Sequence, residues 1–322
     1  RTTDRANSAD HTDSLTVSGA AFPEYPFASH WHTHASGLRQ HYLDEGSGEV
    51  VLMLHGNPTW SYYYRHLVSA LCATHRCVVP DHIGMGLSDK PDDSHYEYSL
   101  RQRVDDLDDL LRSVIDADPV SANQPLTLVL HDWGGMIGMA WAVRNPTRLA
   151  RLVIMNTAAF PLPREKHMPR ALTLVRNSAL GAWLVLRLNE FAGVAARVAF
   201  KMPVSREVRK AYTGPYDSPA NRIATLRFVQ DIPLQEGDPG FDIVLNTAEH
   251  LDLLRDLPCL IAWGDRDFVF DRAFLRTWQE YFPAAELRRL EDCGHYVLED
   301  GGQELIDTIR NFIAIKEDSS HG

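Results

Sequence analysis

Short apolar runs alternate along most of the chain with longer stretches whose apolar residues recur at helical spacing. The runs predict strands near residues 38–43, 50–54, 77–79, 126–130, 152–155, 259–263 and 286–290. The longer stretches predict helices near residues 99–115, 136–143, 272–281 and 303–315. Such alternation of strand and helix is typical of an α/β fold with a mostly parallel sheet.

The alternation stops between residues 161 and 245. Pro161, Pro163 and Pro169 interrupt the chain, and residues 170–200 then form an apolar helical stretch without strands. We interpret residues 161–245 as a helical cap inserted into an α/β core of residues 23–160 and 246–322. Residues 1–22 are polar and predict a flexible tail. An apolar cap indicates an apolar pocket beneath it, although these helices could instead only add to the core packing.

The predicted strand at 126–130 leads directly into His131-Asp132-Trp133-Gly134-Gly135 and a helix. A strand that turns sharply into a helix around one reactive side chain is typical of a nucleophile elbow. Asp132 would be the nucleophile, although the usual leading glycine is replaced by Leu130. The alternative is an ordinary turn in which Asp132 caps the helix N-terminus.

Two further polar candidates follow later strands, Asp267 after residues 259–263 and His295 after residues 286–290. Ligands in parallel α/β sheets bind at the carboxyl ends of the strands, so these side chains should converge with Asp132. The order Asp132, Asp267, His295 is the order of nucleophile, acid and histidine in the α/β-hydrolases. We therefore predict a catalytic triad, against the alternative of a hydrolase fold that only binds a ligand.

Three longer motifs carry a resemblance to a known family: His55–Ser61 (HGNPTWS), Pro80–Pro91 (PDHIGMGLSDKP) and His131–Gly135 (HDWGG). Over residues 25–315 the chain resembles the haloalkane dehalogenases, which have the α/β-hydrolase fold. That resemblance implies hydrolysis of carbon–halogen bonds, giving alcohol and halide, with Asp132 as nucleophile and His295 as base. It also implies that Asn57 and Trp133 bind the halide and the oxyanion.

The position of the acid varies among the haloalkane dehalogenases. One subgroup carries a glutamate where this chain has Asn156, and the others use an aspartate in the loop that follows Trp263 here. The family pattern selects Asp267 over Asp265 in that loop. This combination resembles the third dehalogenase subfamily, whose members form large assemblies, and therefore implies a homo-oligomer.

A second resemblance lies in residues 156–163 (NTAAFPLP), 227–234 (RFVQDIPL) and 295–300 (HYVLED). These segments look like the β-lactone decarboxylases of bacterial long-chain olefin synthesis, which gives the alternative function on the same Asp132 site. Epoxide hydrolases are a further alternative. Tyr212 and Tyr216 could then hold the epoxide oxygen, although both could equally be packed tyrosines of the cap.

A carboxylate nucleophile suits attack at a saturated carbon, because it displaces the leaving group and forms an ester. Histidine can then activate water, while backbone N–H groups stabilise the oxyanion. This chemistry requires no metal and no cofactor, and none is expected. The expected ligands are a small apolar substrate, either a haloalkane or a long-chain β-lactone, and a halide ion.

Net charge and cysteine usage narrow the function classes. The chain has 32 Lys and Arg against 43 Asp and Glu, a net charge of −11, so nucleic acids and anionic membrane surfaces are poor partners. Its four cysteines lack metal or disulfide spacing, which predicts reduced thiols in a cytoplasmic protein. Cys293, two residues before His295, is expected to be a small buried residue. No apolar run approaches the about 18 residues of a membrane span, and no signal peptide is expected.

Overall fold

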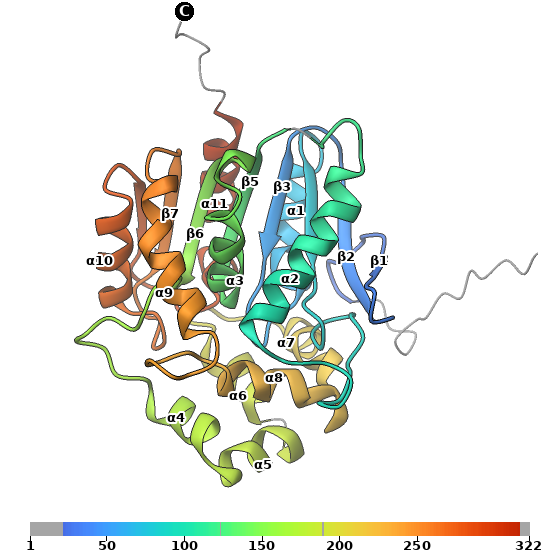
Figure 1. Cartoon of the computed structure of the whole chain (residues 1–322), viewed down its shortest axis with the longest axis vertical. Coiled ribbons are helices and arrows are strands. Elements are labelled where there is room, and N and C mark those ends of the chain that lie inside the picture. The colour runs from blue at the N-terminus through green and yellow to red at the C-terminus, as the bar shows by residue number, and fades with distance from the viewer. Residues whose placement is uncertain (1–21, 123, 189, 316–322) are drawn as a thin grey trace, which may run out of the picture.

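The computed structural model describes residues 22–122, 124–188 and 190–315 (Figure 1). The tail predicted over residues 1–22 therefore lies outside the described residues, except for Phe22. The ring of Phe22 packs edge-to-face on Trp60, with the ring centroids 4.8 Å apart.

An eight-stranded sheet forms the centre of the molecule (Figure 1). β2 runs antiparallel to both of its neighbours, and the other neighbouring strands are parallel. This mostly parallel sheet, flanked by helices, confirms the predicted α/β fold class. In sheet order the strands are β1 (His30–Thr33), β2 (Arg39–Glu45), β4 (Arg76–Pro80), β3 (Val50–Leu54), β5 (Leu126–Asp132), β6 (Leu149–Thr157), β7 (Cys259–Gly264) and β8 (Glu286–Leu290).

The edge strand β1 was not among the predicted strands. Its sequence, HWHT, places histidines rather than apolar side chains at its more buried positions. The apolar alternation that identifies a half-buried strand is therefore missing. β1 pairs with β2 from His30 opposite Tyr42 to Thr33 opposite Arg39.

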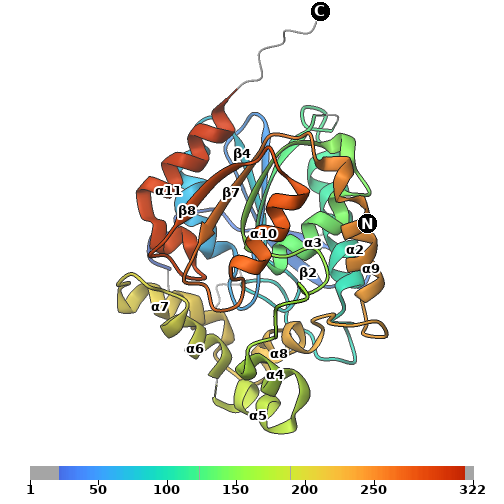
Figure 2. The ribbon, with the colours of Figure 1, turned by 90° about the vertical axis from the view of Figure 1, so that its left-hand side faces the viewer.

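Helices cover both faces of the sheet (Figures 1 and 2). One layer contains α1 (Arg65–Leu71) and α11 (Val297–Ala314), and the other contains α2 (Leu100–Leu111), α3 (Trp133–Ala142), α9 (Phe241–His250) and α10 (Arg272–Tyr281). Each layer forms its own apolar core with one face of the sheet. Along β3, for example, Leu52 and Leu54 belong to the core under α2 and α3, whereas Val51 and Met53 belong to the core under α1 and α11.

The last helix begins earlier than the sequence predicts. α11 starts at Val297 and contains a kink at Gly302, whose φ of 53° and ψ of −149° are not helical. The predicted start near residue 303 is therefore the start of the second, straight part of α11. Short 3₁₀ or π turns complete the described elements: η1 (Ser61–Tyr64), η2 (Arg112–Asp116), η3 (Pro146–Arg148), η4 (Gly214–Tyr216), η5 (Ala220–Arg222) and η6 (Leu251–Leu254).

Among the described residues, six α-helices separate β6 from β7 along the chain, and the first five of them lie together at the end of the sheet where the parallel strands finish (Figure 1). The cap boundary expected at residue 245 falls inside α9, which packs on α3. The division of the chain into core and cap remains a prediction. The five helices are α4 (Arg170–Asn177), α5 (Ala179–Leu188), α6 (Glu190–Val198), α7 (Arg206–Thr213) and α8 (Ile223–Gln230).

Among the described residues, no helix is both long enough and apolar enough to cross a membrane.

Candidate active site

The turn between β5 and α3 is strained and leaves no space for additional side chains. β5 ends at Asp132 and α3 begins at the next residue. The backbone of Asp132 has a φ of 51° and a ψ of −127°, which non-glycine residues rarely adopt. A Cβ atom on Gly134 would lie 2.0 Å from the carbonyl oxygen of Leu54, and one on Gly135 would lie 1.9 Å from Oγ1 of Thr157. Backbone strain of this kind is concentrated at functional sites.

The side chain of Asp132 does not cap α3. It makes no hydrogen bond to the first turn of that helix, so the N-cap alternative is wrong. Instead, Oδ1 of Asp132 accepts a hydrogen bond from the backbone N–H of Asn57 at 2.7 Å. Oδ2 of Asp132 lies 3.5 Å from Nε2 of His295. The carboxylate thus points toward the residues predicted to work with it.

The structure brings the three predicted triad residues together. Nδ1 of His295 lies 2.8 Å from Oδ2 of Asp267, so the imidazole stands between the two carboxylates. All three residues are buried. The other oxygen of Asp267 accepts a hydrogen bond from the backbone N–H of Val269 at 2.7 Å. The ring of Phe270 stacks on the imidazole, with centroids 5.8 Å apart.

The two carboxylates determine the charge on His295. Burial by itself would lower the pKa of His295, but the negative charges of Asp267 and Asp132 raise it to about 10. Burial would likewise raise the pKa of Asp132, but the hydrogen bond and positive charge from His295 bring it below its usual value. At neutral pH these shifts favour an ionised carboxylate beside an imidazolium.

The turn after β7 separates its two aspartates. Asp267 faces His295, whereas the carboxylate of Asp265 forms ion pairs with Arg289 and with Arg272. Asn156, at the end of β6, makes two hydrogen bonds to the backbone of Gly264 at the end of β7. Its Nδ2 donates to the carbonyl oxygen of Gly264 at 3.1 Å, and its Oδ1 accepts from the Gly264 N–H at 2.8 Å. Asn156 therefore fixes the strand end from which Asp267 extends.

Asn57 and Trp133 both line the space next to Asp132. The Nδ2 amide of Asn57 donates to the carbonyl oxygen of Thr225 in α8 at 2.9 Å, and its Oδ1 is buried and has no hydrogen-bond partner within the described part of the chain. The indole of Trp133 packs edge-to-face on Phe228, with centroids 5.2 Å apart. One amide hydrogen of Asn57 is thus directed to the helical segment rather than to the site.

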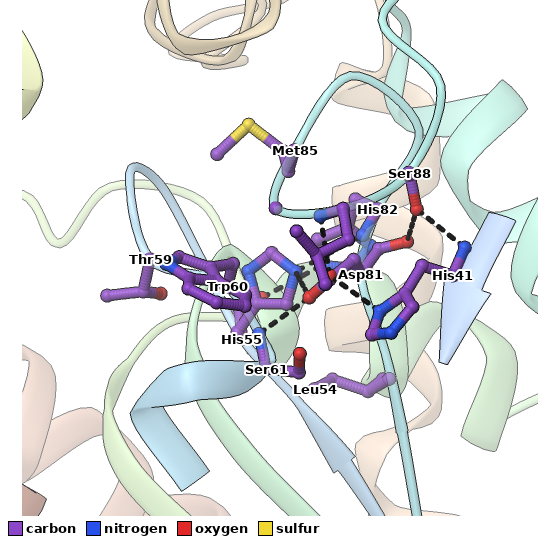
Figure 3. A network of polar contacts seen from close by, with 12 residues as sticks. His41, Leu54, His55, Thr59, Trp60, Ser61, Asp81, His82, Met85 and Ser88 are labelled. Carbon is purple, nitrogen blue, oxygen red and sulfur yellow. Dashed lines mark hydrogen bonds and ion pairs between the residues drawn. The ribbon is translucent and has the colours of Figure 1, made fainter. Parts of the chain in front are cut away.

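A buried polar network holds the turn that carries Asn57 (Figure 3). The carboxylate of Asp81 accepts from the backbone N–H of Ser61 at 2.6 Å and lies 2.9 Å from Nδ1 of His41. Nε2 of His55 accepts from the backbone N–H of His82 at 3.1 Å. Burial lowers the pKa of His55, which keeps this imidazole neutral and able to accept. The network therefore fixes the backbone on both sides of the turn.

His131, directly before Asp132 in the chain, contacts both the backbone and the ring of His295. Its Nε2 donates to the carbonyl oxygen of His295 at 2.8 Å, and its ring lies 4.8 Å from the His295 ring and 4.4 Å from that of Tyr63. Burial lowers the pKa of His131 to about 3, so this ring is neutral. No periodic pattern predicts these supporting roles of His131, Asp81 and His41, because buried polar residues carry no apolar signal.

A cavity of about 320 Å³ extends from Asp132 into the inserted helices. Trp133 and His295 line the same end of this cavity as Asp132. The remaining lining is almost entirely apolar, so the cavity suits alkyl chains. Lining residues from α4, from α5, from the segment before α10 and from α10 itself include Leu172, Val175, Leu184, Val185, Phe268 and Phe274.

The tyrosines of the epoxide hydrolase alternative do not line this cavity. The hydroxyl of Tyr212 donates to Glu299 at 2.5 Å, and that of Tyr216 donates to the carbonyl oxygen of Thr59 at 3.4 Å. Both are buried packing residues. Cys293 is also buried, and burial raises its pKa to about 11, which leaves it a neutral thiol.

A family model described as the alpha/beta hydrolase fold matches residues 49–302. The chain belongs to the α/β-hydrolase family. Within that family it is 51% identical to a cis-3-alkyl-4-alkyloxetan-2-one decarboxylase of Shewanella oneidensis, over 91% of this chain and 90% of the relative. It is 31% identical to haloalkane dehalogenase 2 of Mycobacterium tuberculosis, over 88% of this chain and 94% of the relative.

Solved structures of α/β-hydrolases agree with this placement. The crystal structure of haloalkane dehalogenase DbeA from Bradyrhizobium elkani superposes with a TM-score of 0.79, at 25% identity, over 89% of this chain and 98% of the other. Both resemblances seen in the sequence, to haloalkane dehalogenases and to β-lactone decarboxylases, are confirmed. The β-lactone decarboxylase is the more similar in sequence of the two.

Proposed function

We propose that the chain is a β-lactone decarboxylase that converts a cis-3,4-dialkyl oxetan-2-one into an alkene and carbon dioxide, with Asp132 as the nucleophile. The 51% identity to a decarboxylase of that substrate class, over nine-tenths of both chains, is the observation that carries the proposal. The sequence alone ranks dehalogenation first and lactone decarboxylation second. The proposal reverses that order, because the sequence identity to the dehalogenase is only 31%.

In the first step, the ionised carboxylate of Asp132 attacks the saturated ring carbon that bears the ring oxygen. The ring C–O bond breaks, its electron pair stays on that oxygen, and the lactone carbonyl becomes a free carboxylate. The product is a β-carboxylate ester on Asp132. The attack inverts the reacting carbon, so the ester oxygen and the new carboxylate start on opposite sides of the C–C bond between them.

In the second step, the carboxylate leaves as carbon dioxide. The electrons of the broken C–C bond form the alkene, and the ester C–O bond breaks to return the carboxylate of Asp132. No water is consumed, and no oxidant is needed. Because the two leaving groups are already on opposite sides, the alkyl groups remain on one side, which makes the expected product a cis alkene.

His295 and Asp267 have a clear part in this route. A protonated His295 can donate to the departing carboxylates, including that of Asp132 in the second step, while Asp267 orients the imidazole. The 3.5 Å between Nε2 of His295 and Oδ2 of Asp132 supports this role. The apolar cavity adds a reason for long alkyl chains, since away from Asp132, Asn57 and His295 its described lining is apolar apart from Lys166, which is paired with Asp271.

Haloalkane dehalogenation is the second candidate, and the pairing of Asn57 with Trp133 at the site favours it. In this reaction His295 would have to accept a proton from water, so that the water can attack the ester on Asp132. The hydrogen bond from Nδ2 of Asn57 to Thr225 leaves less donor capacity for a halide. We therefore expect slow dehalogenation beside the main reaction. Halide binding and self-association remain predictions.

A side-by-side assay tests this ranking. The purified chain is given a long-chain cis-3,4-dialkyl β-lactone or 1-bromohexane, and alkene, carbon dioxide and bromide are measured. We expect one carbon dioxide for each alkene from the lactone, and slow bromide release. Fast bromide release with no alkene from any β-lactone would instead establish a dehalogenase.

Replacing the nucleophile tests the covalent route. Asp132→Asn should abolish alkene formation, while Asp105→Asn, at an exposed position of α2, should leave it unchanged. In the wild type, rapid quenching should trap the mass of one lactone on the peptide that contains Asp132. Retained turnover in Asp132→Asn would exclude the carboxylate as nucleophile.

A further inference from the structure

A histidine pair and an aspartate meet at the edge of the sheet, outside the lining of the active-site cavity. His32 lies in β1 and His34 directly follows that strand, so both side chains point to the same side. Asp109 reaches them from α2. This contact joins the edge strand to a helix about 75 residues further along the chain.

The three side chains converge on one point. Oδ2 of Asp109 lies 2.8 Å from Nε2 of His32 and 2.7 Å from Nδ1 of His34. The donor atoms of the three residues all lie within 4.8 Å of one another. The side chain of Asp109 is 52% exposed, whereas those of His32 and His34 are 11% and 7% exposed. The cluster is therefore preformed on the protein side and open to water on one side.

The hydrogen bonds of Gln40 determine which nitrogen of His34 is free to act as a ligand. Nε2 of Gln40 donates to the carbonyl oxygen of Asp81 at 3.1 Å, and a carbonyl oxygen can only accept. The opposite atom of the amide, Oε1, therefore faces Nε2 of His34 at 2.9 Å. Nε2 of His34 must then carry a hydrogen. In the neutral imidazole, Nδ1 is consequently an acceptor.

This tautomer creates a conflict at Asp109. The lone pair of Nδ1 of His34 faces a carboxylate oxygen 2.7 Å away, so two acceptors meet. A positive charge between or on these groups removes the conflict. A metal ion supplies it without changing the tautomer, and a histidine ligand commonly donates its other N–H to a carbonyl or carboxylate oxygen, as His34 does to Gln40.

We propose that His32, His34 and Asp109 bind a divalent transition-metal ion of the Zn²⁺ type, with water completing the coordination. Two imidazoles and one carboxylate suit Zn²⁺, Cu²⁺ or Ni²⁺ better than Mg²⁺ or Ca²⁺, which prefer oxygen ligands alone. The bound ion fastens β1 to α2. The site is separate from the proposed decarboxylation, which needs no metal.

The test uses the full-length chain without an affinity tag, after treatment with EDTA. Zn²⁺ is titrated by calorimetry into the wild type and into Asp109→Asn and His32→Gln, and the thermal midpoint is recorded with and without Zn²⁺. We expect about one ion per chain in the wild type and a higher midpoint. Each variant should bind at least about tenfold more weakly, since even outer-sphere changes cost about that much.

Matched controls keep the result specific. His95→Asn removes another histidine that is paired with a carboxylate, 2.7 Å from Asp92, and should not change binding. Mg²⁺ in place of Zn²⁺ should give no heat and no shift of the midpoint. Equal Zn²⁺ affinity in the wild type and in Asp109→Asn would overturn the proposal. Absence of Zn²⁺ binding to the wild type would also overturn it.

Discussion

Asp265 and Asp267 stand two residues apart and face different partners, which makes them a matched pair for testing the acid. Asp267→Asn removes the charge beside Nδ1 of His295 and should lower turnover roughly 10²- to 10⁴-fold. Asp265→Asn removes only ion pairs with Arg289 and Arg272 and should change turnover less than about threefold, because it is Asp267 that contacts the imidazole. Steady-state rates of the two variants decide the matter. Equal losses would show that the acid is misassigned.

The pH dependence of stability reports the charge on His295. Folding raises the pKa of this residue from 6.5 to about 10, so the folded chain holds the proton more tightly than the unfolded chain. The resulting stabilisation is fully present below about pH 6.5 and is lost as the pH rises toward 10. The free energy of unfolding of the wild type should therefore fall relative to that of His295→Gln across this window. Denaturant titrations of both proteins measure this difference, and a constant difference would contradict the raised pKa.

At the scale of elements, the β5–α3 elbow depends on close backbone approach. Gly134→Ala would place a Cβ atom 2.0 Å from the carbonyl oxygen of Leu54, so β3 and α3 must move apart. We expect a loss of about 1–3 kcal/mol in the free energy of unfolding, as for other overpacked positions, together with lower activity. Chemical denaturation measures the first effect.

Gly193 in α6 provides the control for that substitution. No atom of the described residues lies within 4 Å of a Cβ built on Gly193, so Gly193→Ala should be neutral or stabilise the helix by up to about 1 kcal/mol. Equal stability of the two alanine variants would show that the elbow is less tightly packed than the structure indicates.

At the scale of the whole molecule, the sheet and the helices α4 and α5 together line the apolar cavity beside Asp132. Val185 of α5 lines the cavity, whereas Leu188 on the same helix is 52% exposed. Val185→Trp should shorten the alkyl chains that are accepted. Each methylene that no longer fits loses about 0.8 kcal/mol, or about fourfold in kcat/KM. Leu188→Trp should leave the chain-length preference unchanged.

A homologous series of substrates measures this effect, either dialkyl β-lactones or 1-bromoalkanes. The ratio of kcat/KM for long and short chains separates cavity filling from a general loss of activity. An unchanged ratio in Val185→Trp would mean that alkyl chains lie elsewhere.

The sequence by itself determined the order of the elements and the identity of the triad candidates. The continuous apolar runs of β3 and β5 predict fully buried strands, and in the structure every residue of both strands is buried. Asp132, Asp267 and His295 could be selected because parallel strands place their carboxyl ends at one edge of the sheet. The sequence did not predict β1, because its more buried positions hold histidines, which carry no apolar signal.

Only the tertiary structure decided which polar side chains meet. It placed Tyr212 outside the cavity and brought Asp109 to the histidines of the sheet edge. It also showed the neutral His131 behind His295. These contacts join residues far apart in the chain, and local periodicity reports which face a residue occupies but not which partner stands opposite. The direction of a buried hydrogen bond is therefore a property of the folded molecule.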